Sequence, residues 1–161
     1  MPLSKELAEA VRNKLEDARQ GNFEGAEMEA IRPVLEVQAA WSLIPAMDEL
    51  LIERTHTRDG YHLFLYPFEG RLVHQGLAAL FAYRIGQLQP ISFNYAANDY
   101  GIELLSASPI PIEAALDSGL FSDHSLEADI LRSMNAAEMA KRQFREVARI
   151  AGLVFPGYPG Q

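Results

Sequence analysis

The 161-residue sequence contains no cysteine and no long apolar segment. Without cysteine the chain has no disulfide framework, no thiolate nucleophile and no cysteine-ligated zinc site, a composition compatible with a reducing compartment. The N-terminal segment lacks the apolar run of a signal peptide, and no later segment approaches the roughly 18 apolar residues that indicate a transmembrane helix. We therefore expect a cytoplasmic protein without a membrane partner.

The sequence also lacks the short motifs of nucleotide binding and of common hydrolases. It contains no Walker-type phosphate loop, no Gly-x-Gly-x-x-Gly, no Gly-x-Ser-x-Gly and no His-Glu-x-x-His. The carboxylates of Asp48, Glu49 and Glu53 could form an acid/base pair, but we interpret them as solvated surface groups. The chain alone is therefore expected to be neither an enzyme nor a cofactor-binding protein, and a small enzyme of unknown activity that uses these carboxylates is kept as a third hypothesis.

Positive charge is scarce, with 14 lysine and arginine residues against 22 aspartate and glutamate residues and a net charge of -8. This balance argues against binding of nucleic acid through bulk electrostatics. The acidity is concentrated, because no lysine or arginine lies between Arg84 and Arg132. Basic side chains gather in two other places, which are Arg54, Arg58, Arg71 and Arg84 in the central region and Lys141, Arg142, Arg145 and Arg149 near the C-terminus.

The segment from Asp48 to Arg84 gives the clearest local pattern. Alternating apolar residues predict strands over 50–55 and 61–68, joined by a two-residue turn at Asp59-Gly60. Pro67 ends the second strand, and a helix is expected to begin at Gly70. Its inward face should contain apolar side chains at three- and four-residue spacing, namely Val73, Leu77, Leu80, Phe81 and Ile85.

The remaining segments predict helices on both sides of a second hairpin. A first helix capped by Ser4 should run to Arg19, and a second over 24–41 should be kinked or restarted at Pro33. Strands follow from Pro90 and over 102–105, then a short helix over 112–116. Two C-terminal helices are expected, the first capped by Ser122 or Asp123 and running to about Ser133, and the last beginning at Asn135.

These patterns predict an α+β fold of two β-hairpins, each followed by a helix and flanked by N-terminal and C-terminal helices. Residues 1–45 form the expected N-terminal helical segment, and residues 46–161 form the hairpin-helix-hairpin core with the C-terminal helices. The repeated order of hairpin and helix suggests a weak internal duplication. His56 and His62 should lie on opposite faces of the first hairpin, so they are not expected to share a metal.

Three features could bind nucleic acid, and each has a simpler explanation. Arg71 and His74 lie in the first turn of a helix, where a phosphate is favoured, but Arg71 could instead pair with Glu69 or Glu53 beside a partly buried His74. Trp41 could stack on an unpaired base or pack in the core. The basic face formed by Lys141, Arg142, Arg145 and Arg149 could contact phosphates or be simply solvated.

Long phrases of the sequence resemble the Lhr-type (large helicase-related) superfamily 2 DNA helicases, and specifically their ligase-associated DEXH-box subgroup. The phrases are LEVQAAWSLIP, LLIERTHTRDGYHLFLYPFEGRLVHQGLAALFAYRI, FNYAANDYGIELLS and LEADILRSMNAAEMAKRQFREVARIAGLVFPGYPGQ. The resemblance implies an accessory domain downstream of the ATPase core, in a longer helicase that continues past Gln161. It also implies DNA contact at Arg71 and His74 in GRLVH and at Lys141, Arg142 and Arg145 in KRQFRE, with Trp41 as a further candidate.

Two functions follow from this resemblance. The first is a non-catalytic DNA-contacting accessory domain of an ATP-dependent DNA-repair helicase that translocates 3′ to 5′. Its expected partners are single-stranded or tailed duplex DNA, the RecA-like and winged-helix domains of the parent, and a DNA ligase system. ATP and magnesium would be bound by the parent helicase and not by this chain. The alternative is a structural or protein-interaction module that braces the motor domains without touching DNA.

Overall fold

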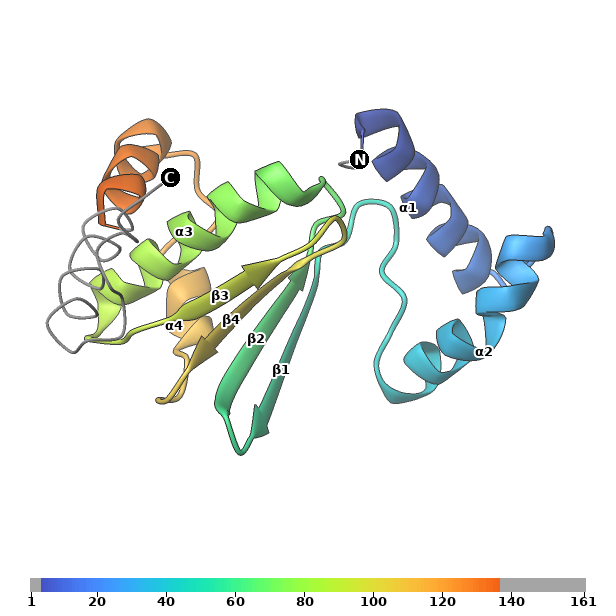
Figure 1. The fold of residues 1–161 in the computed structure, drawn as a ribbon, viewed down its shortest axis with the longest axis horizontal. Helices are drawn as coiled ribbons and strands as arrows, with labels where there is room; N and C mark the ends of the chain where they lie inside the picture. The colour runs from blue at the N-terminus through green and yellow to red at the C-terminus, as the bar shows by residue number, and fades with distance from the viewer. Residues whose placement is uncertain (1–3, 137–161) are drawn as a thin grey trace, which may run out of the picture.

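The structure, a computed structural model, describes residues 4–136 and shows the expected α+β fold (Figure 1). Two β-hairpins form one sheet, and in the sequence helices precede the first hairpin, separate the two hairpins and follow the second. The residues 126–136 are helical as well. The named elements are α1 (Lys5–Arg19), α2 (Ala26–Trp41), β1 (Leu51–Thr57), β2 (Gly60–Tyr66), α3 (Arg71–Leu88), β3 (Asn94–Ala97), β4 (Ile102–Ser106) and α4 (Ile112–Asp117).

The four strands form an antiparallel sheet in the order β1-β2-β4-β3. The central strands alternate between buried and half-buried residues, with Leu63 and Leu65 of β2 opposite Leu104 and Ile102 of β4. These side chains share one face of the sheet because residues two apart in a strand point the same way. Helices α3 and α4 pack against that face, which is therefore the core face.

Helix α3 spans the core face with a buried side that differs in part from the predicted one. Phe81 and Ile85 are buried as expected. Val73 is largely exposed, and His74 is fully buried in its place. The inward face therefore begins one residue later than the apolar spacing predicts, and the first turn presents a polar side chain to the core.

The N-terminal helices α1 and α2 have a separate cluster of buried side chains, which consists of Ala18, Met28, Leu35 and Ile44. Ser4 caps α1 as predicted, since its hydroxyl accepts from the backbone N–H of Leu7. The buried side of α1 includes Ala8, whereas the neighbouring Leu7 is half exposed. Helix α2 continues through Pro33 without a restart.

The first hairpin is shifted at its turn relative to the prediction. Thr57 pairs with Gly60, so the two loop residues are Arg58 and Asp59. Gly60 has a φ of 135°, and a Cβ there would lie 2.4 Å from the carbonyl oxygen of Ser106. Glycine is therefore required as the first residue of β2, not as part of the turn. The shifted pairing leaves each side chain on the face of the hairpin where it was expected. His56 and His62 therefore lie on opposite faces, as predicted.

The predicted boundary between the two C-terminal helices is wrong. The helix begins at residue 126, after the backbone of Ser125 adopts a positive φ of 58°, and neither Ser122 nor Asp123 caps it. Asn135 lies inside this helix and does not start a new one. The later residues of the predicted last helix lie outside the described range. Within residues 4–136, no helix has the length and apolarity needed to cross a membrane.

Candidate nucleic-acid interface

Trp41 is the last residue of α2, and 88% of its surface is exposed. Of the two alternatives for Trp41, packing in the core is therefore wrong. It ends a stripe of exposed apolar side chains along α2, because Ile31, Val34 and Val37 precede it at helical spacing and are 44%, 64% and 49% exposed. An indole ring held at a helix end and open to solvent can stack on another planar group.

The first turn of α3 holds Arg71 and His74, and the structure gives them different roles. The His74 ring is fully buried. Its Nε2 accepts from the backbone N–H of Glu69 at 3.0 Å, and its Nδ1 lies 2.6 Å from the carbonyl oxygen of Asn98. Because a carbonyl can only accept, Nδ1 donates and the ring is the neutral Nδ1–H tautomer. His74 has no nitrogen left for a phosphate, which corrects its prediction as a DNA contact.

Arg71 remains exposed, but the helix N-terminus beside it already holds a carboxylate. The backbone N–H of Arg71 donates to Asp99 Oδ1 at 3.1 Å. The expected ion pairs of Arg71 with Glu69 or Glu53 do not form, since Glu69 pairs with Arg12 and Glu53 accepts from Gln38 at 3.0 Å. Among residues 4–136 the guanidinium of Arg71 has no ion-pair partner. Arg71 is thus free to meet an anion, with Asp99 as a competing charge.

Most other arginines of the described chain are neutralised by carboxylates. Arg54 pairs with Glu113, Arg19 with Glu16 and Arg32 with Glu36. These pairs are exposed or nearly so, and each adds little to stability. They do reduce the positive potential of the surface, so a phosphate backbone would meet few unpaired cations here.

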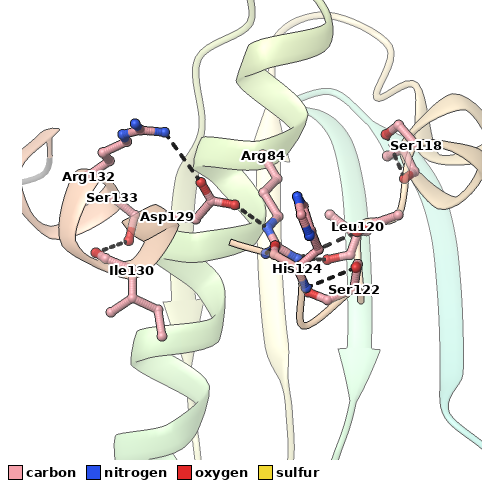
Figure 2. A network of polar contacts seen from close by, with 11 residues as sticks. Arg84, Ser118, Leu120, Ser122, His124, Asp129, Ile130, Arg132 and Ser133 are labelled. Atoms are coloured by element: carbon pink, nitrogen blue, oxygen red, sulfur yellow. Dashed lines mark hydrogen bonds and ion pairs between the residues drawn. The ribbon is translucent and has the colours of Figure 1, made fainter. Parts of the chain in front are cut away.

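Arg84, which composition alone placed among the basic surface residues, is a structural residue (Figure 2). Its side chain extends from α3 and is 11% exposed. The Nε donates to Asp129 Oδ2 at 3.1 Å, and Nη1 donates to the carbonyls of Leu120 at 2.9 Å and Ser122 at 2.7 Å. A third acceptor, the carbonyl of His124, lies 3.3 Å from Nη2. One guanidinium thereby fixes the loop over 119–124 and the following helix to α3.

The Arg84 network fixes the base of the segment that leads to the predicted C-terminal contacts. Asp129 lies in the helix over 126–136. Lys141, Arg142 and Arg145 themselves lie outside the described residues, so their role stays a prediction. Sequence reasoning missed Arg84 because its acceptors are backbone carbonyls, which leave no trace in the sequence.

The structure does not bring the predicted contacts into one pocket. Figure 1 shows the end of α2, which carries Trp41, well separated from the first turn of α3, which carries Arg71. Helices α1 and α2 stand beyond strand β1, on the opposite side from α3 and α4. Three polar contacts among the described residues join the two parts. Arg12 donates to the carbonyl of Pro67 at 2.7 Å and to the carboxylate of Glu69, and Gln38 donates to Glu53. A ligand that touched both Trp41 and Arg71 would have to be extended.

Tyr66 of β2 should make the stability of the fold depend on pH. Burial raises the pKa of its phenol to about 12, and the carboxylates of Glu53 and Glu103 act in the same direction. Between pH 10 and 12 the unfolded chain releases this proton first, so stability should fall as pH rises through that window. In urea unfolding at about pH 9 and about pH 11, we expect Tyr66→Phe to lose less stability than the wild type. An equal loss in both proteins would contradict this assignment.

The fold and these surfaces define a small α+β domain whose exposed candidate contacts, Trp41 and Arg71, lie on two separate helix ends. Within residues 4–136 no three histidine or acidic side chains are grouped so that they could hold a metal ion. The features fit a domain that contacts other macromolecules.

Comparison with known proteins places the chain in a family. Residues 44–161 match the family described as DEAD/H associated, and the chain belongs to this family. The chain is 27% identical over 128 residues to the ATP-dependent helicase Lhr-Core protein 2 of Thermococcus barophilus, a match that covers 77% of this chain and 14% of that protein. Its fold is similar to that of the Mycobacterium smegmatis helicase Lhr, solved with ssDNA and AMP-PNP. The TM-score is 0.62 at 23% identity, over 100% of this chain and 22% of that one.

The chain therefore corresponds to an accessory region of Lhr-type helicases, as the resemblance of its sequence implied. It spans only 14% and 22% of the length of these two relatives.

Proposed function

We propose that this chain is a DNA-contacting accessory domain of an ATP-dependent Lhr-type helicase that acts in DNA repair. In the parent protein the RecA-like domains bind ATP and magnesium, and the accessory domain contacts the single strand that they move. The similar Mycobacterium smegmatis helicase was solved with ssDNA, which supports a nucleic-acid ligand for this region. A DNA ligase system is the further partner that the ligase-associated resemblance implies.

The observation that carries the proposal is the exposure of Trp41. A tryptophan ring has the largest apolar surface of any side chain, and folding normally covers it. Here 88% of it is open at the end of α2. Stacking on an unpaired base would cover one face of the indole and requires no bulk positive charge, so it is compatible with a net charge of -8.

Arg71 is the second contact in this proposal. Arg71 is exposed, so its guanidinium can meet a phosphate beside the Asp99 carboxylate that already occupies the helix N-terminus. Lys141, Arg142 and Arg145 complete the proposed set. Because Trp41 and Arg71 lie on well-separated helix ends, the strand would run between them in an extended form.

Intrinsic fluorescence tests the proposal directly, since Trp41 is the single tryptophan of the chain. We expect single-stranded DNA to quench its emission and expect Trp41→Ala to weaken binding about 5- to 150-fold, the equivalent of about 1–3 kcal/mol for one stacked base. Trp41→Phe is the matched variant, because it keeps a ring that can stack. Anisotropy of labelled DNA measures the affinities at low and moderate salt.

Arg71→Ala and the double variant Arg142→Ala/Arg145→Ala test the phosphate contacts in the same titration. Each should lower affinity and reduce the dependence of binding on salt. The measurements should be made on the 161-residue chain and on the full-length helicase. The DNA-contact proposal fails if DNA leaves the Trp41 emission unchanged in both proteins and Trp41→Ala binds DNA as the wild type does.

A bracing module is the second candidate, and the apolar stripe on α2 favours it. Ile31, Val34 and Val37 form a continuous surface with Trp41, and such a surface is typical of a protein contact. In that case Val34→Ser with Val37→Ser should disturb helicase assembly or stability while DNA affinity is unchanged. The two functions therefore predict different effects of substitutions on α2. DNA contact predicts that Trp41→Ala weakens DNA binding, and bracing predicts that Val34→Ser with Val37→Ser leaves DNA binding unchanged.

A further inference from the structure

The face of the sheet opposite α3 and α4 carries an organised set of side chains that the proposed DNA contact does not use. We call it the open face. Strand alternation and the register assign its members. From β1 to β3 they are Leu51, Glu53, Thr55, Tyr66, Phe64, His62, Glu103, Leu105, Ala96 and Asn94.

Phe64 lies at the centre of the open face between two carboxylates. It is directly opposite Glu53 on β1 and directly opposite Glu103 on β4. Neighbouring strands are about 4.8 Å apart, so one acidic residue stands on each side of the ring. Along β2 the rings continue in a stack, with centroids 5.9 Å apart from His62 to Phe64 and 6.5 Å apart from Phe64 to Tyr66.

Both carboxylates are held in place by hydrogen bonds from neighbouring side chains. Gln38 of α2 donates to Glu53 Oε1 at 3.0 Å. The His62 Nδ1 lies 2.6 Å from Glu103 Oε1, and the His62 Nε2 lies 2.7 Å from the Thr57 hydroxyl. In the described part of the chain, no lysine or arginine pairs with Glu53 or Glu103. Neither carboxylate is therefore neutralised by a lysine or arginine of the described chain.

The negative potential of the open face acts on Tyr66, which belongs to the same face. Glu53 and Glu103 both disfavour ionisation of Tyr66, whose pKa is raised to about 12 mainly by burial. Two fixed carboxylates beside apolar rings create a field that attracts a cation and repels a phosphate backbone. The open face is therefore the wrong surface for DNA and a suitable one for a basic group.

The open face is also hollowed next to Phe64. A groove there is lined by Phe64, Tyr66, Ala96, Tyr100 and Glu103, among others. The alanine leaves room that a larger residue of β3 would fill. Tyr100 is half exposed, and the Glu103 side chain retains 33% exposure. The groove thus combines an aromatic wall with an accessible carboxylate at one side.

We propose that this groove binds an arginine side chain presented by a partner protein segment. The methylene stem of the arginine lies against Phe64 and Tyr66, and its planar guanidinium donates to the carboxylate of Glu103, with Glu53 adding a second negative charge. Arginine fits better than lysine because its flat, weakly hydrated head packs against aromatic surface. The inference does not depend on whether Trp41 and Arg71 contact DNA.

An NMR titration of the labelled 161-residue chain tests this inference. The probe is a blocked Arg-Gly-Arg tripeptide, and the matched control is the same peptide with citrulline, which has the same shape without the charge. We expect saturable shifts of the Phe64, Tyr66 and Tyr100 ring signals with the arginine peptide only. Glu103→Gln and Glu53→Gln should each weaken binding about two- to fivefold, as expected for partly exposed ion pairs.

Glu103→Gln keeps an oxygen that can accept from His62, so it removes charge without removing the hydrogen bond that positions residue 103. Glu113→Gln, which changes a carboxylate paired with Arg54 elsewhere, should bind the arginine peptide as the wild type does. Three results would overturn the inference: equal shifts with the citrulline peptide, no shift of these rings with either peptide, or displacement of the arginine peptide by single-stranded DNA that shifts the same rings.

Discussion

Arg84→Ala should lower the free energy of unfolding by about 3–5 kcal/mol, which is the usual cost of removing one partner from a buried ion pair. The loss has two parts. Asp129 would be left as a buried charge, and the carbonyls of Leu120 and Ser122 would lose their donor. Urea unfolding followed by far-UV circular dichroism measures the change through the shift in midpoint at constant slope.

Arg132→Ala is the matched control, because Arg132 approaches the same carboxylate of Asp129 at 3.8 Å but is 65% exposed. Its removal should cost no more than about 0.5 kcal/mol. Arg84→Lys keeps the charge but cannot supply the planar fork that reaches several carbonyls, so its stability should fall between those of wild type and Arg84→Ala. Equal stability of the Arg84→Ala and Arg132→Ala variants would show that the network of Figure 2 does not hold the loop.

His74→Leu should cost about 2–4 kcal/mol of stability, because it keeps the volume of a buried side chain but removes both of its hydrogen bonds. The N–H of Glu69 and the carbonyl of Asn98 would each lose a partner. Those two groups belong to the loop before α3 and to the turn after β3, so the ring joins the two hairpins at one end of the sheet. Urea unfolding of the variant and the wild type gives the difference.

His56→Leu is the control for this substitution, since His56 is exposed on β1 and its ring only stacks on Tyr61 with centroids 4.3 Å apart. It should change stability by less than about 1 kcal/mol. DNA affinity separates the structural role of His74 from the predicted contact. A His74→Leu variant that remains as stable as wild type but binds DNA more weakly would restore the contact role.

The hairpins could be predicted from the sequence because their signals are local. Alternating residues such as Leu63 and Leu65 predict the pleat, and the Asp59-Gly60 pair predicts a reversal within one residue of the observed turn. The exact pairing depends on a distant strand, since Gly60 is fixed by the approach of Ser106. That contact joins residues more than forty positions apart, and no local pattern contains it.

The candidate site was harder to predict because exposure depends on tertiary packing. The apolar spacing of α2 predicts a buried face, yet Val34 and Trp41 are open while Leu35 is buried. In the same way a histidine in a first helical turn fits an anion site by position, and only the proximity of Asn98 shows that His74 is already satisfied. Helix ends and polar residues could be found from the sequence, but their partners could not.

The strand order has a consequence for how the chain reaches this fold. The pairs β1–β2 and β3–β4 are close in sequence and can form as independent hairpins, but the central pair β2–β4 joins Leu65 to Ile102 across the whole of α3. Closing that long loop is entropically unfavourable until α3 can dock on the joined strands. The slow step of folding should therefore be the meeting of two preformed hairpins beneath α3, and substitutions along the β2–β4 seam should slow folding more than they speed unfolding.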